Sequence, residues 1–326
     1  MAMKLSFHPQ KKNEPPELIV TKPAKATVKL SNLNMFKQLE KTPPVSEVEL
    51  TRRKRVEGIL QELDSLVGLD SVKKLIMEIQ AFVEIQKRRA KENLITEPLV
   101  LHMIFRGNPG TGKTTVARIV GRLFKEMGIL QKGHVIEVER ADLVGEYIGH
   151  TALKTREQLK RALGGILFID EAYSLARGGE KDFGKEAIDT MVKTMEDNKD
   201  NLILILAGYK QEMNWFLETN PGLRSRFPIH IDFPDYNIRE LLAIAEQMLT
   251  KRQYKLSEDG KNELERLLTE KLAKSHEHSG NARLVRNFIE KALRQQAVRL
   301  VGESSLSREE LIFIIASDIK LAAESL

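Results

Sequence analysis

The sequence predicts an α/β protein, with a doubly wound, five-stranded parallel sheet followed by a small helical domain. Between residues 99 and 233, short apolar runs alternate with helical patterns, which is typical of a parallel sheet with helices between its strands. The first apolar run passes through a glycine-rich turn directly into a helix. From Ile238 onward, apolar residues recur only at helical spacing. We therefore expect the chain to change architecture near Pro234.

The apolar runs define the expected strands and the periodic segments define the expected helices. The runs at 166–169 and 202–207 are apolar at every position, which predicts strands buried on both faces. We expect strands at 99–105, 134–139, 166–169, 202–207 and 230–233. We expect helices at 45–63, 71–91 (with Asp70 as its cap), 115–126, 153–162, 185–195 and 211–217, and then at 238–252, 258–274, 282–301 and 307–326. The segment 220–227 is expected to be a loop.

Composition divides the chain into three parts: 1–59, 60–234 and 235–326. Residues 1–45 combine several prolines with scattered lysines and lack the apolar residues of a core, so we expect little fixed structure there. Residues 1–60 contain 12 Lys and Arg against 6 Asp and Glu, and the remainder contains 40 of each, from totals of 52 and 46. A basic tail on a neutral body gives little support for nucleic-acid binding, because such tails often only keep a protein soluble.

Cysteine content and hydropathy indicate the cellular compartment in which the protein is expected. The sequence contains no cysteine, which excludes disulfides and thiolate metal sites and fits a reducing cytoplasm. No run approaches the roughly 18 apolar residues of a membrane span, and the first residues have no apolar signal-peptide core. We expect a cytoplasmic protein.

The glycine-rich turn has the spacing and context of a phosphate-binding loop. It lies between an expected strand and an expected helix, as this motif requires. Glycines allow the backbone to approach phosphate oxygens, and the helix N-terminus adds partial positive charge. Lys113 is then placed to reach the β- and γ-phosphates, and the Thr114 hydroxyl to bind Mg²⁺. The residues of the loop are Gly107, Asn108, Pro109, Gly110, Thr111, Gly112, Lys113 and Thr114.

Two adjacent carboxylates, Asp170 and Glu171, follow the third expected strand. Open α/β sheets bind their ligands at the carboxyl ends of the strands, so this pair should lie near the phosphate-binding loop. One carboxylate can hold Mg²⁺ and the next can activate an attacking water. The alternative is a surface pair at a strand end, which the fully apolar strand beside it disfavours.

Several motifs together resemble those of AAA+ ATPases, over about residues 63–326. Within that family they are similar to the CbbX/CfxQ branch, which includes red-type Rubisco activases and sporulation proteins of endospore-forming bacteria, and the sporulation members resemble this chain most. The resemblance implies a P-loop NTPase sheet with a small C-terminal helical lid. The motifs are GNPGTGKTT, DLVGEYIGHT, LFIDEAYSL, LAGYK, NPGLRSRF and GNAR.

The resemblance also implies residue roles. Residues 107–114 match Walker A and residues 166–171 match Walker B, with Asp170 as the Mg²⁺ ligand and Glu171 as the catalytic base. Arg226, with Arg224 as the second candidate, resembles an arginine finger that acts on a neighbouring subunit. Arg283 resembles the sensor-2 arginine of the lid. Tyr147, in Tyr-Ile-Gly, resembles a pore residue that grips a polypeptide; a packing role in the core is the alternative.

The resemblance implies a ring-forming ATPase, a homohexamer, that uses ATP and Mg²⁺ to remodel a protein client in sporulation. A Rubisco activase-like chaperone is the alternative. A nucleic-acid motor would need the basic N-terminus, and the neutral body carries no basic recognition helix, so we do not expect nucleic acid as a partner. The residue after the fourth strand that orients water in many AAA+ proteins stays unassigned here, and the client is not identified.

Overall fold

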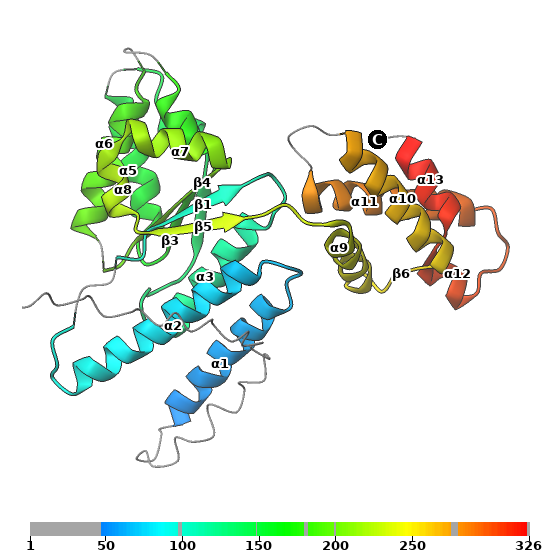
Figure 1. The fold of residues 1–326 in the computed structure, drawn as a ribbon, viewed down its shortest axis with the longest axis horizontal. Helices are drawn as coiled ribbons and strands as arrows, with labels where there is room; N and C mark the ends of the chain where they lie inside the picture. Colours follow the sequence, from blue (N-terminus) through cyan, green and yellow to red (C-terminus); the bar gives the residue numbers. More distant parts are fainter. Residues whose placement is uncertain are drawn as a thin grey trace, which may run out of the picture. The chain divides into compact units, whose positions relative to one another are not determined.

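The computed structural model describes residues 47–96, 100–147, 149–178, 182–198, 200–274 and 280–324. The chain divides into two units, residues 1–46 and 47–326, and every element below belongs to the second (Figure 1). The tail predicted for residues 1–45 lies outside the described residues. No described helix has both the length and the apolar character needed to span a membrane.

The main sheet has five parallel strands in the order β2-β3-β4-β1-β5, which confirms the predicted fold class. Ile104 of β1 lies beside Leu206 of β4 on one side and His230 of β5 on the other. The central strands β3 and β4 are buried at every position, as their apolar runs predicted. The strands are β1 (Met103–Gly107), β2 (Val135–Val138), β3 (Ile166–Ile169), β4 (Ile203–Gly208) and β5 (Ile229–Phe233).

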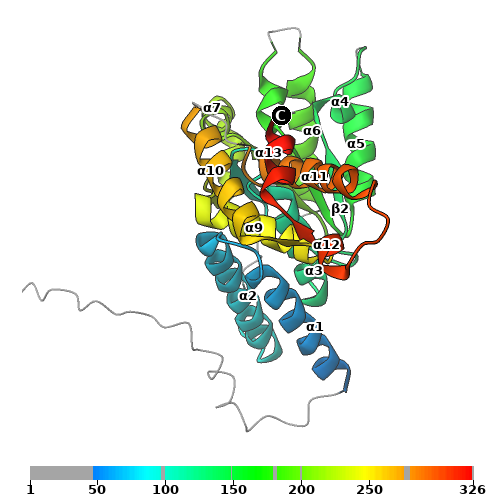
Figure 2. The ribbon, with the colours of Figure 1, turned by 90° about the vertical axis from the view of Figure 1, so that its right-hand side faces the viewer.

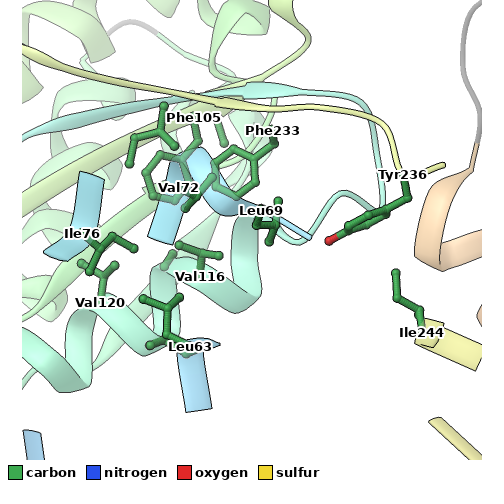
Figure 3. Close-up of a cluster of buried hydrophobic side chains, with 14 of the residues drawn as sticks. Leu63, Leu69, Val72, Ile76, Phe105, Val116, Val120, Phe233, Tyr236 and Ile244 are labelled. Carbon is green, nitrogen blue, oxygen red and sulfur yellow. The ribbon is translucent and has the colours of Figure 1, made fainter. Parts of the chain in front are cut away.

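Helices cover both faces of this sheet. Alternate side chains of β1 point to opposite faces, so Ile104 packs into one buried cluster and Phe105 into the other. Figure 3 shows the Phe105 cluster, in which Val72 and Val116 approach the sheet from two different helices. The helices are α1 (Glu47–Asp64), α2 (Asp70–Lys91), α3 (Lys113–Glu126), α4 (Arg140–Leu143), α5 (His150–Ala162), the 3-10 helix η2 (Ala172–Ala176), α6 (Gly184–Asp197), α7 (Lys210–Thr219) and α8 (Pro221–Arg226).

Two local predictions for this part of the chain were wrong. Residues 220–227 are not a loop, because Pro221 begins the short helix α8. Proline has its φ fixed near the helical value and needs no N–H bond at a first helical position, so it favours a helix start there. Asp70 does not cap α2: it is the first residue of that helix, and the capping position is held by Leu69 in the left-handed region.

The C-terminal part is a lid of helices that pack on one another (Figure 2). Its elements are α9 (Ile238–Thr250), β6 (Lys255–Leu256), α10 (Glu258–Lys274), α11 (Asn281–Leu300), α12 (Arg308–Ile312), β7 (Phe313–Ile314) and α13 (Ala316–Glu324). The prediction of helices alone was wrong, and so was the single helix at 307–326. Phe313 and Ile314 leave the helix to pair with β6, and the Asp318 carboxylate accepts a hydrogen bond from Ile315 N, 3.1 Å, as the chain re-enters a helix.

His102, immediately before β1, is a buried group whose protonation opposes folding. Its Nδ1 accepts a hydrogen bond from Leu204 N at 3.1 Å, and its ring lies 5.7 Å from that of Phe227. Burial lowers the pKa of His102 to about 4 from 6.5. The folded state therefore holds the neutral imidazole, whereas the unfolded chain takes up a proton below pH 6.5.

We expect His102 to make the protein less stable as the pH falls from 6.5 to 4. The pKa difference corresponds to a loss of about 3 kcal/mol in the free energy of unfolding across that window. The matched variant is His102→Asn, whose amide oxygen can still accept from Leu204 N but does not titrate. Urea unfolding at pH 7.5 and pH 5 should show a smaller difference for the variant. An unchanged difference would assign the acid sensitivity to other groups.

Candidate nucleotide-binding site

The loop between β1 and α3 has a backbone shape that depends on its glycines. Gly110 and Gly112 lie in the left-handed region, with φ of 76° and 97°. A side chain at Gly107 would collide with the backbone, because a Cβ there would lie 2.3 Å from Phe233 O. The hydroxyl of Thr111, which is fully buried, donates to Asn108 O at 2.8 Å. The loop is thus held from both its own backbone and the adjacent β5.

Lys113 is the first residue of α3 and points back into this loop. Its Nζ donates to the carbonyl oxygens of Gly107, 2.8 Å, and Asn108, 2.9 Å. Burial lowers the pKa of Lys113, the Asp170 carboxylate raises it, and the Arg283 guanidinium lowers it further. A half-buried cation bonded to neutral carbonyls at a helix N-terminus makes a site suited to an anion.

The acidic pair lies at the carboxyl end of β3, where the sequence placed it. Asp170 directly follows the strand, and its Oδ1 accepts a hydrogen bond from Glu171 N at 3.0 Å. Glu171 has a φ of 46°, in the left-handed region that a long side chain rarely adopts. Such backbone strain persists where the surroundings fix it and is common at active sites.

The structure brings four of the predicted residues together. The carboxylates of Asp170 and Glu171 both raise the pKa of Lys113, and the Arg283 guanidinium, from the lid, lowers it. Asp235, in the segment between β5 and α9, contributes a further negative charge. The predicted Walker A, Walker B and sensor-2 residues therefore share one electrostatic environment, although they lie far apart in the sequence.

Tyr209 also lies in this environment, and sequence reasoning did not find it. Burial raises its pKa, and the nearby Glu171 carboxylate raises it further. Its ring centroid is 6.1 Å from that of Tyr173 in η2. The available signal was its place one residue after β4, which is parallel to β3 and ends at the same edge of the sheet.

The two candidate arginine fingers lie elsewhere, on α8. Arg226 donates from Nε to Glu196 Oε1 at 2.6 Å and from Nη1 to Gly222 O at 2.8 Å. Arg224 is exposed. The contacts of Arg226 are therefore with α6 and with its own helix.

Tyr147 lies on the connection between α4 and α5 with 66% of its surface exposed. Its ring contacts that of His150 edge-on, with centroids 5.4 Å apart. The connection is fixed at its base, because Thr151 Oγ1 accepts from Gly145 N at 2.9 Å. The following Ile148 lies outside the described residues. An exposed ring above a fixed base does not match the alternative interpretation of Tyr147 as a core residue.

Comparison with known proteins identifies the family. The model for the ATPase family associated with various cellular activities (AAA) matches residues 103–235, and the AAA lid domain model matches residues 237–326. Stage V sporulation protein K of Bacillus subtilis is 53% identical over 284 residues, which cover 86% of this chain and 88% of that protein. This chain belongs to the AAA+ ATPases. It therefore binds nucleotide and is an ATP hydrolase.

Other AAA+ relatives lie in the CbbX/CfxQ branch, as the motifs indicated. The CfxQ homolog of Galdieria sulphuraria is 46% identical over 272 residues, covering 82% of this chain and 88% of that protein. CbbX of Cereibacter sphaeroides is 47% identical over 249 residues, covering 76% and 80%. Among solved structures, the RuvB Holliday junction branch migration motor of Thermotoga maritima has a TM-score of 0.54 at 20% identity, covering 81% of this chain and 71% of that one. That likeness shows the fold alone.

The residues of this AAA+ site fit ATP and Mg²⁺. The glycine turns, the Lys113 ammonium and the N-terminus of α3 form a cradle for phosphate. Thr114 and Asp170 offer the oxygen ligands that Mg²⁺ prefers. Within the described ranges, no group of three or more His, Asp or Glu side chains could hold a metal alone. A phosphate-loop site needs fewer, because phosphate and water supply the remaining ligands.

Proposed function

We propose that this AAA+ ATPase forms a hexameric ring in the cytoplasm and uses ATP hydrolysis to remodel a protein client gripped by Tyr147. The observation that carries the proposal is the exposed ring of Tyr147 on the connection after α4, whose Arg140 donates to Ser174 O shortly after the acidic pair. Similarity to stage V sporulation protein K supports a role in sporulation. Residues 60–234 would bind nucleotide, residues 235–326 would cover it, and residues 1–59 would form a basic extension.

In this proposal each residue of the site has one task. Lys113 neutralises the β- and γ-phosphates, and Thr114 and Asp170 hold Mg²⁺, which supplies charge stabilisation during phosphoryl transfer. Glu171 accepts the proton of the attacking water. Arg283 contacts the nucleotide from the lid, and Arg226 from a neighbouring subunit balances the charge that develops on the γ-phosphate.

Hydrogen bonds join the catalytic segment to α4, the helix that precedes the Tyr147 connection. Ser174 N donates to Glu171 O at 2.8 Å, and Ser174 O accepts from Arg140 Nη1 at 2.7 Å. Arg140 begins α4, which leads directly into the connection that carries Tyr147. In this proposal a displacement of Glu171 during the ATP cycle reaches α4 through the Ser174 backbone and the Arg140 side chain, and α4 leads into the proposed gripping loop.

We expect Tyr147→Ala to separate ATP hydrolysis from work on a client. Because Tyr147 is exposed, the variant should assemble, bind ATP and keep its basal turnover within a few-fold. It removes an aromatic contact of about 2 kcal/mol with a bound polypeptide. Stimulation of the ATPase by an unfolded model polypeptide, reduced casein, should be lost in Tyr147→Ala and largely retained in the matched control Tyr147→Phe. Equal stimulation of Tyr147→Ala and the wild type would contradict the gripping role.

Similarity to CbbX supports a second candidate, a Rubisco activase-like chaperone. Both candidates use the same ring and differ in the client. The Glu171→Gln variant, which should hold ATP without hydrolysing it, offers a trap for that client, followed by identification of what co-purifies. Single-stranded DNA is the negative control, because the neutral body predicts that it does not stimulate the ATPase. Salt-sensitive stimulation that disappears on deleting residues 1–55 would favour a nucleic-acid motor instead.

A further inference from the structure

Asn281, the first residue of α11, lies where three segments of the chain meet. Its side chain is fully buried and its backbone is left-handed, with φ of 46°. Its Oδ1 accepts from Tyr236 N at 3.0 Å, and its Nδ2 donates to Asp235 Oδ1 at 2.7 Å. The same Nδ2 lies 3.4 Å from Pro109 O. One side-chain amide therefore contacts both the segment between β5 and α9, which leads to the lid, and the phosphate-binding loop.

Further bonds join the same segments. Asn108 Nδ2 donates to both carboxylate oxygens of Asp235, at 3.1 and 2.9 Å. The Tyr236 hydroxyl donates to Thr111 O at 3.1 Å (its ring and hydroxyl are visible in Figure 3). Asp235 thus accepts from Asn108 of the loop and from Asn281 of the lid at once. The carboxylate is a shared acceptor for two amide donors.

The start of α11 also packs directly on the phosphate-binding loop. Ala282 N donates to Gly110 O at 3.2 Å. A Cβ at Gly110 would lie 2.6 Å from Gly280 O and 2.9 Å from Arg283 N, so the two backbones leave no room for a side chain. The backbone of Arg283 therefore lies directly against Gly110. Its position depends on how α11 is held against the loop.

We propose that Asn281 and Asp235 form a latch that holds α11 on the phosphate-binding loop and thereby positions Arg283. They are positioning residues, which act through the backbone of α11 and through Asn108. The expected effect of the latch on turnover rests on the proposed role of Arg283, whereas its effect on the lid position does not. Asparagine is suited to the place, because it tolerates the left-handed backbone and supplies both a donor and an acceptor. A change in the loop backbone during the ATP cycle reaches the lid through these bonds.

The variant Asn281→Asp tests the latch without removing the side chain. It keeps the acceptor for Tyr236 N and a residue type that tolerates the left-handed backbone, but it loses the donor and places two carboxylates together. The reversed pair Asp235→Asn with Asn281→Asp restores one donor and one acceptor. Asp235→Asn alone is the mild control, because an amide oxygen at 235 can still accept from Asn281.

The absence of cysteine from the sequence allows the lid position to be measured directly. Spin labels on Lys193→Cys and Ala297→Cys, both exposed positions, report the distance between α6 and α11 in the full chain by pulsed electron resonance. We expect a narrow distance distribution for the wild type, Asp235→Asn and the reversed pair, and a broad or shifted one for Asn281→Asp. Turnover of ATP should fall at least tenfold in Asn281→Asp and return to within threefold of the wild type in the reversed pair.

Two outcomes would overturn the latch. One is an unchanged distance distribution in Asn281→Asp. The other is a reversed pair whose distance distribution and turnover stay as perturbed as those of Asn281→Asp. If Asn281→Asp does not fold, the same comparison applies to folding, since a latch predicts that the reversed pair folds. If Arg283→Ala leaves turnover unchanged while the distances still respond to Asn281→Asp and recover in the pair, the latch stands and the proposed role of Arg283 fails.

Discussion

The variant Glu171→Gln is expected to bind ATP and to lose turnover by about a hundred- to ten-thousand-fold, the range that a general base contributes. Glutamine keeps the shape of the side chain but cannot accept the proton of the attacking water. Asp170, which accepts from the backbone N–H of residue 171, stays in place for Mg²⁺. Binding of a fluorescent ATP analogue and release of inorganic phosphate measure the two properties separately.

Two controls give this experiment its meaning. Lys113→Ala should weaken nucleotide binding itself, because it removes the half-buried cation proposed to neutralise the phosphates. Glu212→Gln makes the same chemical change on α7, in a residue whose charge reaches Tyr209 but which has no proposed role, and it should keep normal turnover. Normal hydrolysis by Glu171→Gln would show that the base lies elsewhere at this edge of the sheet.

The sheet and the phosphate-binding loop could be predicted because their signals are local. A parallel strand with helices on both faces is typically a near-continuous apolar run, and β3 and β4 are buried at every position. The loop combines glycines, a lysine and a helix start within eight residues, so its chemistry is visible in one short segment. The acidic pair followed from the rule that ligands bind at the carboxyl ends of parallel strands.

The errors arose where a short segment can adopt two structures. Residues 220–227 contain Pro221 and Gly222, which are typical of a loop, but proline also begins helices. The helical turn of α8 buries the side chain of Leu223 in the core. Residues 307–326 keep helical spacing, yet the apolar Phe313 and Ile314 pair with β6, which is more than 50 residues earlier in the sequence. Helical periodicity alone gives no sign of such a distant partner.

The polar contacts of the site could not be predicted at all. Asn108, Asp235 and Asn281 meet across separations of 127 and 46 residues, and no spacing rule relates them. Tyr209 was similarly hidden, because the residue after the fourth strand had no assigned role and a tyrosine suggests packing. Such contacts depend on how the lid returns to the loop, and the chain must be folded before they exist.

Arg226→Ala is expected to lower turnover by about a thousandfold or more, the contribution of an arginine supplied to a phosphoryl-transfer site. The wild-type contacts of Arg226 are with Glu196 and Gly222, away from Lys113 of the same chain, so the site it completes should belong to a neighbour. Arg224→Ala, the matched change two residues earlier, should have the smaller effect if Arg226 is the main finger. The reverse order would exchange the two assignments.

Mixing two inactive variants then decides whether Arg226 acts on its own subunit or on the next. Protomers with Arg226→Ala keep a complete phosphate-binding loop, and protomers with Lys113→Ala keep the arginine. If Arg226 acts across the interface, random equal mixing in a ring gives a complete site at about a quarter of the interfaces, so activity should recover toward a quarter of the wild-type rate. Both variants must be co-assembled, which refolding or subunit exchange in ATP provides, and size-exclusion chromatography with light scattering checks that rings have formed. If Arg226 acts within its own chain, neither protomer holds both groups, and mixed rings should stay as inactive as the separate variants.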